Sequence, residues 1–326
     1  MGKKILEQLA LSLCIPLCLQ VIGCAHFSLN PDYTGPKAVP REIKKKFTYE
    51  KSAPEYKETI LEITEGYTIK RIEFTPSHTI LPTHHSICMD YYDITGHHAT
   101  PVIIVLPILG GSNNISKNFA SYFAHEGYAA VIVNRQKEYT NLRDINKIDM
   151  TLCQMVFDCK QAIDWIETQD DLDTNSIGLF GVSMGGIKGS LVSALDDRIK
   201  ASVFALTAGD IPYILTHSSE KGIKRRRKEI MKEKKLTRTG LYNELTEKIS
   251  CDPLQYAEYI DARSVLMVLA LFDRIVPYAK GKELRKKMGK PETIYLFCGH
   301  LTAFPFIYYI KKKSLQFFKK HFPKSK

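Results

Sequence analysis

The sequence predicts an α/β fold with a mostly parallel central sheet and helices on both faces. Short apolar runs rich in β-branched residues, such as residues 101–107 and 129–134, are typical of strands buried on both faces. These runs alternate along the chain with segments of helical periodicity instead of falling into separate blocks. The chain has 326 residues, 44% of them hydrophobic, which is enough for one domain with a large core.

The predicted elements begin with an antiparallel part. Residues 59–76 read as two strands around the turn residues Glu65 and Gly66, and residues 87–94 read as a third strand. A series of buried strands separated by helices follows. These strands are expected at residues 101–107, 129–134, 176–180, 201–206, 264–272 and 292–297, with helices near 115–127, 149–166, 185–195, 277–288 and 304–320.

One interval departs from this alternation of strands and helices. Residues 210–262 are charged, helix-prone and long, so we expect a helical cap inserted over the carboxyl edge of the sheet. The earlier helix at residues 149–166 has apolar residues at steps of three and four and is expected to begin at Asp149.

Residues 177–186, IGLFGVSMGG, place a serine between glycines directly after a strand. Gly181, Ser183 and Gly185 fit the pattern G-x-S-x-G, with a strand before it and a helix after it. A serine at such a sharp turn has a strained backbone, so its close neighbours must lack a Cβ. The following helix would direct its N-terminus at a developing oxyanion, with the Met184 N–H as one donor. The alternative is a turn that happens to carry a serine.

Two further residues complete a candidate triad. A serine hydroxyl is a poor nucleophile until a base takes its proton. Asp273 follows the next-to-last predicted strand, and His300 follows the last one. Because the carboxyl ends of parallel strands meet at one edge of a sheet, we expect both side chains to converge on Ser183. His300 would be the base, and Asp273 would orient it.

Other interpretations are open at these positions. Asp210 follows an earlier strand and is a rival acid. Asp273 could instead cap the helix that begins near Pro277, and His300 could be a structural histidine. Asp273 is favoured because it ends the strand immediately before the strand that leads to His300.

The chain order Ser183, Asp273, His300 and the segments FDRIVP and GH resemble the α/β-hydrolase superfamily over about residues 58–322. The resemblance is greatest to its dienelactone-hydrolase and acetyl-esterase branch. It implies an α/β-hydrolase fold and a serine mechanism without a cofactor. It also implies a second oxyanion donor in the segment PILGGS, where alignment on the two glycines selects the Leu109 N–H. Pro107 and Ile108 replace the His-Gly that many relatives carry there.

The expected function is therefore hydrolysis of carboxylic esters through an acyl-enzyme, on a small-molecule or lipid-like substrate. A serine peptidase of the same fold is the near variant. A catalytically silent lipoprotein that binds an anionic surface or polymer is the alternative from another class. The complete Ser–Asp–His set argues against it, because a binding module has no use for a strained nucleophile.

The N-terminus predicts export. Lys3 and Lys4 precede an apolar stretch that ends in small residues, as in a secretory signal. Residues 21–24, VIGC, resemble the lipobox of bacterial lipoproteins, which implies removal of residues 1–23 and attachment of a lipid such as palmitate to Cys24. Ala25, instead of Asp, after this cysteine resembles lipoproteins that are sent on to the outer membrane, which implies the outer membrane or cell surface over the inner membrane. A plain secretory signal or an uncleaved anchor helix is the alternative.

The polar, proline-rich residues 24–57 are expected to form a tether between this lipid and the domain. The net charge of +11 is concentrated in two runs: residues 219–235 carry +6, and residues 311–326, which include the basic tail 323–326, carry +7. Each run is either a solvated face or a contact to an anionic membrane surface. We expect no nucleic-acid partner, because no nucleic-acid module is recognisable.

The remaining cysteines are expected to be buried free thiols. Cys14 and Cys18 would leave with the signal peptide, and the other five show no regular spacing. These five are Cys88, Cys153, Cys159, Cys251 and Cys298. The pairs His84–His85 and His97–His98 could hold a metal, but no carboxylate lies at ligand spacing, so no metal site is expected.

Overall fold

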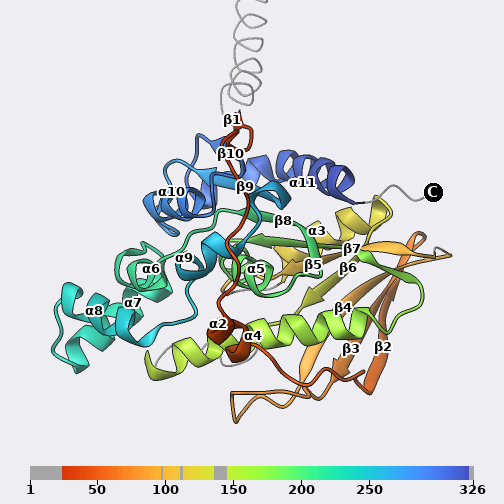
Figure 1. Cartoon of the computed structure of the whole chain (residues 1–326), viewed down its shortest axis with the longest axis horizontal. Coiled ribbons are helices and arrows are strands. Elements are labelled where there is room, and N and C mark those ends of the chain that lie inside the picture. Colours follow the sequence, from red (N-terminus) through yellow and green to blue (C-terminus); the bar gives the residue numbers. More distant parts are fainter. Residues whose placement is uncertain (1–23, 97, 111–112, 136–144, 323–326) are drawn as a thin grey trace, which may run out of the picture.

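The computed structural model describes residues 24–96, 98–110, 113–135 and 145–322 (Figure 1). The predicted signal peptide with Cys14 and Cys18, His97, Gly111 and the basic tail at 323–326 lie outside the described residues. Within the described ranges, no helix combines the length and the apolar character needed to span a bilayer.

The described strands form one mixed sheet in the order β1-β10-β9-β8-β7-β5-β6-β4-β3-β2. Neighbouring strands from β10 through β6 are parallel, whereas β1 at one end and β4, β3 and β2 at the other pair antiparallel. The predicted antiparallel start and parallel continuation are confirmed. The bounds are β1 (Cys24–Phe27), β2 (Tyr56–Ile63), β3 (Tyr67–Phe74), β4 (Ile87–Ile94), β5 (Thr100–Leu106), β6 (Ala129–Val133), β7 (Leu172–Val182), β8 (Ile199–Ala205), β9 (Val265–Ala270) and β10 (Glu292–Leu296).

Helices cover both faces of the parallel part, as predicted (Figure 1). One face carries α3 (Asn114–His125) and α11 (Ile307–His321), and the other carries α4 (Ile145–Ile166), α5 (Met184–Leu195) and α10 (Tyr278–Lys287). Aromatic side chains join the first layer to the sheet. Phe119 and Phe123 of α3 are buried and both contact Phe180 of β7, with ring centroids 4.2 and 5.6 Å away.

The strand order creates a crevice at the carboxyl ends of β5 and β7. The chain runs from β5 through α3 to β6, which lies on one side of β5. It then returns through α4 to β7, which lies on the other side of β5. Such a switch in direction opens a crevice outside the carboxyl ends of the two strands. Leu106 of β5 is paired with Gly181 of β7 at this edge. The serine turn that follows β7 therefore lies beside the loop that follows β5.

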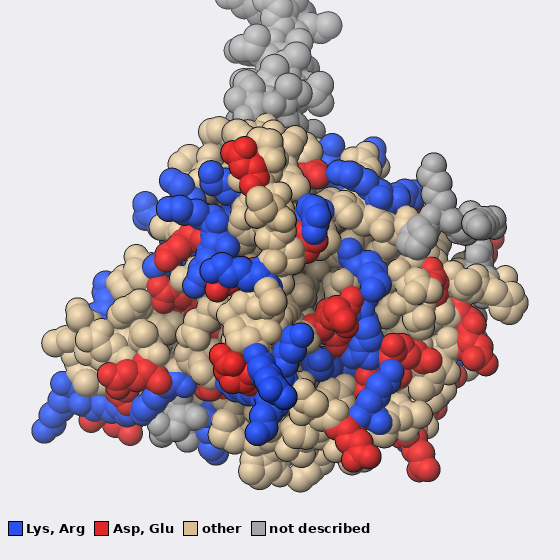
Figure 2. All heavy atoms as spheres, in the orientation of Figure 1, with Lys and Arg blue, Asp and Glu red and all other residues tan. Residues whose placement is uncertain are grey.

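The expected cap is present between β8 and β9. It consists of α6 (Ile211–His217), α7 (Lys221–Glu233), α8 (Arg238–Lys248), α9 (Pro253–Tyr256) and the 3-10 turns η2 (Ala257–Tyr259) and η3 (Ala262–Ser264). The basic run at 219–235 contains the whole of α7, and Figure 2 shows both basic and acidic side chains at the left of the molecule, where the cap lies. This helix buries Ile223, Arg227 and Ile230 and leaves most of its other charged residues toward solvent. Its sequence therefore combines an inward apolar stripe with an outward basic face.

The segment 24–57 does not form the expected tether. Strand β1 pairs antiparallel with β10, the Lys37 N–H donates to Glu258 O at 2.8 Å, and Lys46 of the helix α2 (Arg41–Lys46) donates to Ser250 Oγ at 2.6 Å. Phe47 is buried against Phe157 and Tyr256. Composition alone predicted a solvated spacer here, because the few apolar residues that anchor the segment are scattered between prolines and lysines.

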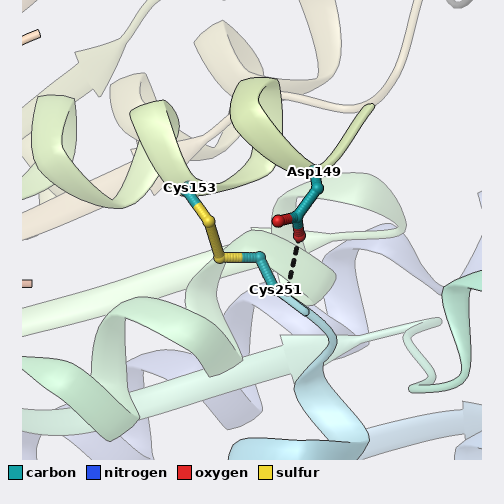
Figure 3. Close-up of side chains that lie close together, drawn as sticks. All are labelled: Asp149, Cys153 and Cys251. Atoms are coloured by element: carbon teal, nitrogen blue, oxygen red, sulfur yellow. Dashed lines mark hydrogen bonds between the residues drawn. A yellow bond between two sulfur atoms is a disulfide. The ribbon is translucent and has the colours of Figure 1, made fainter. Parts of the chain in front are cut away.

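The expectation of free thiols is wrong for Cys153 and Cys251, which form a disulfide across 98 residues of chain (Figure 3). Cys153 lies on α4, and Cys251 lies in the segment that returns from the cap. Asp149, predicted to begin the helix, lies inside α4, and its carboxylate accepts hydrogen bonds from the N–H groups of Ser250 and Cys251. Cys24, Cys88, Cys159 and Cys298 are free.

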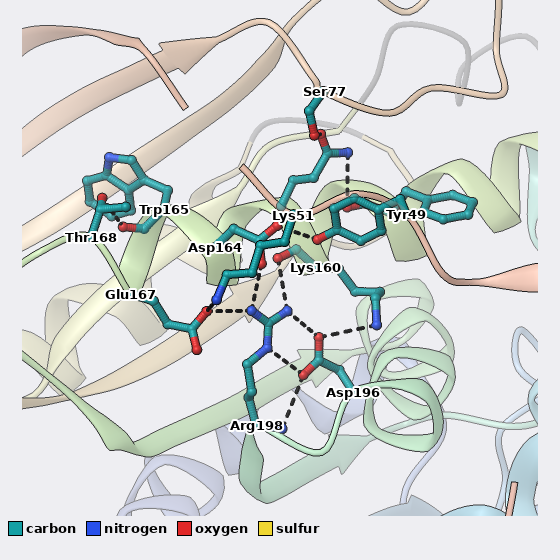
Figure 4. Close-up of polar contacts among 12 residues, drawn as sticks. Tyr49, Lys51, Ser77, Lys160, Asp164, Trp165, Glu167, Thr168, Asp196 and Arg198 are labelled. Carbon is teal, nitrogen blue, oxygen red and sulfur yellow. Dashed lines mark hydrogen bonds and ion pairs between the residues drawn. The ribbon is translucent and has the colours of Figure 1, made fainter. Parts of the chain in front are cut away.

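An ion-pair cluster joins α4, the start of β8 and the N-terminal segment (Figure 4). The Arg198 guanidinium donates to Asp196, Asp164 and Glu167 at 2.6 Å each. The hydroxyl of Tyr49 donates to the same Asp164 carboxylate. The Asp196 and Asp164 side chains are almost fully buried, so the cluster lies partly inside the protein.

Candidate active site

Ser183 lies on a strained turn between β7 and α5. Its backbone has φ +56° and ψ −120°, a conformation that a residue with a Cβ rarely adopts. The neighbouring glycines are required by space: a Cβ on Gly181 would meet the Gly185 carbonyl oxygen, and a Cβ on Gly185 would meet that of Leu106. The Ser183 N–H donates to Ala205 O at 2.8 Å, which fixes the turn to β8.

His300 and Asp273 are brought together at the carboxyl ends of β10 and β9. His300 Nδ1 lies 2.6 Å from Asp273 Oδ2, and the other carboxylate oxygen accepts the N–H groups of Ile275 and Val276 at 2.9 Å. An ionised carboxylate accepts only, so Nδ1 is the donor and Nε2 is the nitrogen that can act as base. Asp273 is buried, which shields this pair from competition by water.

Ser183 and His300 line the same cavity. Among the described residues, no hydrogen bond joins the Ser183 hydroxyl to the His300 ring. Hydrogen bonds between catalytic groups are often long without substrate and tighten only in the complex. The arrangement therefore presents a hydroxyl and an oriented imidazole to one space.

The rival acid, Asp210, is engaged elsewhere. Its carboxylate forms an ion pair with Lys280 at 2.6 Å and accepts the N–H of Tyr213, where it caps α6. Asp210 therefore stabilises the start of the cap, and Asp273 is the acid that contacts His300.

The two predicted oxyanion donors, Met184 and Leu109, both line the cavity. Met184 is the first residue of α5, where N–H groups have no acceptor within their own helix. Leu109 lies in the loop after β5. Sequence reasoning missed Arg135, whose Nη1 donates to the carbonyls of Ile108 and Gly110 at 2.8 and 3.0 Å. Arg135 thus holds the loop on both sides of Leu109.

The cavity at Ser183 has a volume of about 650 Å³. The body of the domain and the cap both contribute to its walls, and most lining side chains are aliphatic or aromatic. The charged lining residues are Glu220, Arg225, Arg226 and Arg227, all at or near the first turns of α7, and His300 lies at the catalytic edge.

The described residues contain one group close enough to share a metal ion, namely Asp149, Cys153 and Cys251. Both sulfur atoms are used by the disulfide, and the carboxylate is occupied by backbone N–H groups, so these residues do not suit a metal (Figure 3). His84 is buried and contacts the Asp158 carboxylate at 3.1 Å. This contact gives His84 a structural role. Cys24 is half-buried in β1, paired with Leu296 at the carboxyl end of β10.

Solved structures of other proteins share this architecture. The chain superimposes on acetyl xylan esterase 1 from Thermoanaerobacterium sp. JW/SL YS485 with a TM-score of 0.63, at 15% identity, over 91% of this chain and 100% of the esterase. A cold-adapted esterase from an Arctic intertidal metagenomic library gives a TM-score of 0.56, at 14% identity, over 82% of this chain and 100% of the other. The protein has the α/β-hydrolase fold.

Sequence comparison agrees with this fold. Residues 89–226 match the model of the Dienelactone hydrolase family. The chain is 27% identical over 137 residues to the "Putative hydrolase YtaP" of Bacillus subtilis, which is 41% of this chain and 40% of that protein. It is 25% identical over 152 residues to the "Uncharacterized protein Rv2627c" of Mycobacterium tuberculosis, 46% of this chain and 34% of that protein. The matched regions thus span less than half the length of these curated relatives.

Proposed function

We propose that this α/β-hydrolase-fold protein is a serine hydrolase that cleaves carboxylic esters. Ser183 is the nucleophile, His300 the base and Asp273 the group that orients the base. The carrying observation is that the Asp273-held imidazole lines the same cavity as the strained Ser183 turn. The family match over residues 89–226 and the esterases among the structural neighbours support an ester-cleaving activity.

The mechanism follows from these positions. His300 Nε2 takes the proton of Ser183 Oγ while Oγ attacks the ester carbonyl carbon, and Asp273 stabilises the resulting imidazolium. The Met184 and Leu109 N–H groups donate to the tetrahedral oxyanion. His300 then protonates the leaving alkoxide, and the alcohol departs. Water repeats the sequence on the acyl-enzyme, which releases the acid and restores Ser183.

A fluorophosphonate probe tests this proposal directly. We expect covalent labelling of the wild-type protein and no labelling of Ser183→Ala. Asp273→Asn should lower the rate of ester hydrolysis by about 10³- to 10⁴-fold, because the imidazole loses its tautomer and orientation. Asp210→Asn is the matched control and should cost far less. A folded wild-type protein that is not labelled would support the catalytically silent lipoprotein instead. Amide hydrolysis as fast as ester hydrolysis would support the peptidase.

We also propose that the protein is exported and anchored to a bacterial membrane by a lipid on Cys24, with the basic runs as a further contact to anionic lipid. The VIGC motif at residues 21–24, after a basic and then apolar N-terminal stretch, supports this proposal. Labelled palmitate should be incorporated into the wild-type protein and not into Cys24→Ser. Incorporation that persists in the variant would contradict it.

A further inference from the structure

The cavity is far larger than an acetyl group requires. Ligand sites for drug-sized molecules span about 300–1,000 Å³, and this cavity of about 650 Å³ lies in the middle of that range. The two-carbon acyl group of an acetate ester would fill a small part of it. The remaining volume therefore has to be explained by a larger substrate.

The cap side of the cavity has an aliphatic wall. Ile223 and Ile230 of α7, Leu241 and Leu245 of α8 and Ile148 of α4 all line it. Each of these side chains is at most 9% exposed and has no polar atom to bind a sugar hydroxyl. A ligand that presented polar groups to this wall would lose hydrogen bonds to water without replacement.

The charged groups near this wall already have partners. The Glu220 carboxylate accepts the Ile223 N–H, and Arg227 donates to the carbonyls of Leu215 and Ser218. Arg226 pairs with Glu229 at 2.7 Å, and the exposed Arg225 lies 3.9 Å from the same carboxylate. These contacts keep the charges at the start of α7 and leave the wall apolar.

We infer that the cavity binds the acyl chain of esters with eight or more carbons in their acid part, under α7 and α8. This inference rests on the proposed ester hydrolysis at Ser183 and adds the substrate class. The hydrophobic effect supplies the selectivity, because each methylene moved from water into the aliphatic wall strengthens binding about fourfold.

A series of p-nitrophenyl esters tests the inference. In the full chain, we expect kcat/KM to rise at least 100-fold from the acetate to the octanoate. Ile230→Trp should fill part of the cavity, lowering kcat/KM at least tenfold for the octanoate and less than threefold for the acetate. Ile60→Trp, on exposed strand β2, is the matched control and should change neither value. Highest activity on the acetate, or equal losses on both esters, would overturn the inference.

A binding measurement separates this inference from the proposed catalysis. Dodecanoate should bind to Ser183→Ala, and Ile230→Trp in that background should weaken binding at least tenfold. Leu245→Phe replaces Ile230→Trp if the latter does not fold. Absence of dodecanoate binding overturns the acyl-chain site even if esters are cleaved. Binding without fluorophosphonate labelling of the wild type overturns the catalysis alone.

A second inference rests on a different observation, the apolar rim beside the cavity mouth. Its side chains follow β9 and β10 and continue into η4 (Leu301–Phe306) and α11, and each is more than half exposed. The rim consists of Phe272, Phe297, Leu301, Phe304 and Tyr308. Leu301 and Phe304 also line the cavity.

Charge and chain position identify what covers this rim. Lys312 and Lys313 follow the rim on α11, and the exposed Lys312 lies over the Tyr308 ring at 5.3 Å, whereas Lys311 lies over Tyr122 of α3. Aromatic and aliphatic side chains bordered by lysines are the composition that binds anionic lipid surfaces. Cys24 is paired with Leu296, directly before Phe297, so the N-terminal segment reaches the domain at the same edge.

We propose that the rim docks on an anionic bilayer, which places the cavity mouth at the lipid surface. The chain has one tryptophan, Trp165, which is fully buried, so an added tryptophan reports on its own surroundings. In the full lipidated chain on vesicles of brominated phosphatidylcholine and phosphatidylglycerol, Tyr308→Trp fluorescence should be quenched at least twofold. Ile60→Trp should not be quenched. Equal quenching of both, or of neither, would overturn the docking.

Discussion

At the scale of single residues, the candidate site depends on contacts that fix the backbone conformation around Ser183 and Asp273. Ser183 is kept in its strained conformation by a hydrogen bond to β8 and by glycines that no other residue could replace. His300 is oriented by one carboxylate oxygen of Asp273, while the other oxygen holds the loop that carries Asp273. Each proposed catalytic group is thus positioned before a substrate arrives.

Arg135 is predicted to position the Leu109 N–H for catalysis. Because its guanidinium binds the carbonyls on both sides of Leu109, Arg135→Met should displace the Leu109 N–H from the oxyanion. We expect kcat to fall about 10- to 100-fold while KM changes little, since the lost contact is made mainly in the transition state. Steady-state kinetics on an activated ester would measure both constants.

The conservative variant separates positioning from stability. Arg135→Lys retains a cationic donor and should recover part of the lost kcat, whereas the unfolding midpoints of the two variants should agree. Equal kcat values in Arg135→Met and the wild type would exclude the positioning role.

At the scale of elements, local sequence patterns predicted most of the fold. The hairpin around Gly66, the buried strands and the G-x-S-x-G turn each depend on residues within about twenty positions, so periodicity and glycine spacing reveal them. The cap could be predicted because a long, charged, helix-prone interval separates two buried strands. Asp273 and His300 could be predicted because parallel strands bring their carboxyl ends to one edge.

Contacts between distant segments could not be predicted in this way. Cys153 and Cys251 are separated by 98 residues, and nothing in the spacing of the cysteines marks them as a pair. Arg135 follows a strand like many other polar residues, and its role appears only when the loop after β5 lies beside it. The docking of residues 24–57 depends on single anchors such as Phe47.

The disulfide between α4 and the end of the cap is predicted to stabilise the folded protein. Replacing both Cys153 and Cys251 with serine should lower the free energy of unfolding by about 2–4 kcal/mol, because the unfolded chain regains the freedom of a long loop. Cys88→Ser, at a free thiol, is the control. The denaturant midpoint should also fall when the wild type is reduced, and an unchanged midpoint would show that the bond does not form.

At the scale of the whole molecule, the Arg198 cluster joins parts that are distant in the chain. Arg198 connects Asp164 and Glu167 of α4 to Asp196 before β8, and Asp164 in turn binds Tyr49 of the N-terminal segment (Figure 4). Removing the guanidinium would leave the buried Asp164 carboxylate without its cation and the buried Asp196 carboxylate with Lys160 alone, 3.6 Å away. Arg198→Met should therefore destabilise the protein by about 3–5 kcal/mol.

The same cluster predicts a loss of stability in acid. Burial by itself would raise the pKa of Asp196, but the hydrogen bonds and charge of Arg198 outweigh it and hold this pKa below its usual value. A lowered pKa in the folded state stabilises the protein above the unfolded pKa of about 3.9, and this contribution disappears as the pH falls through the folded value. Melting temperatures measured from pH 7 to pH 2 should fall more steeply in the wild type than in Asp196→Asn. Parallel curves would contradict this assignment.

The disulfide between Cys153 of α4 and Cys251 also restricts how far the cap can move away from the domain. The segment that returns from the cap is joined to α4 by the Cys153–Cys251 disulfide and by a hydrogen bond from the Cys251 N–H to the Asp149 carboxylate (Figure 3). We therefore expect this side of the cap to stay in place during turnover. Helix α7 and the turn η4 line the same cavity, and within the described residues no disulfide joins them. We therefore expect substrate and product to pass between α7 and η4, and the separation of these two elements to limit the size of the molecules that enter.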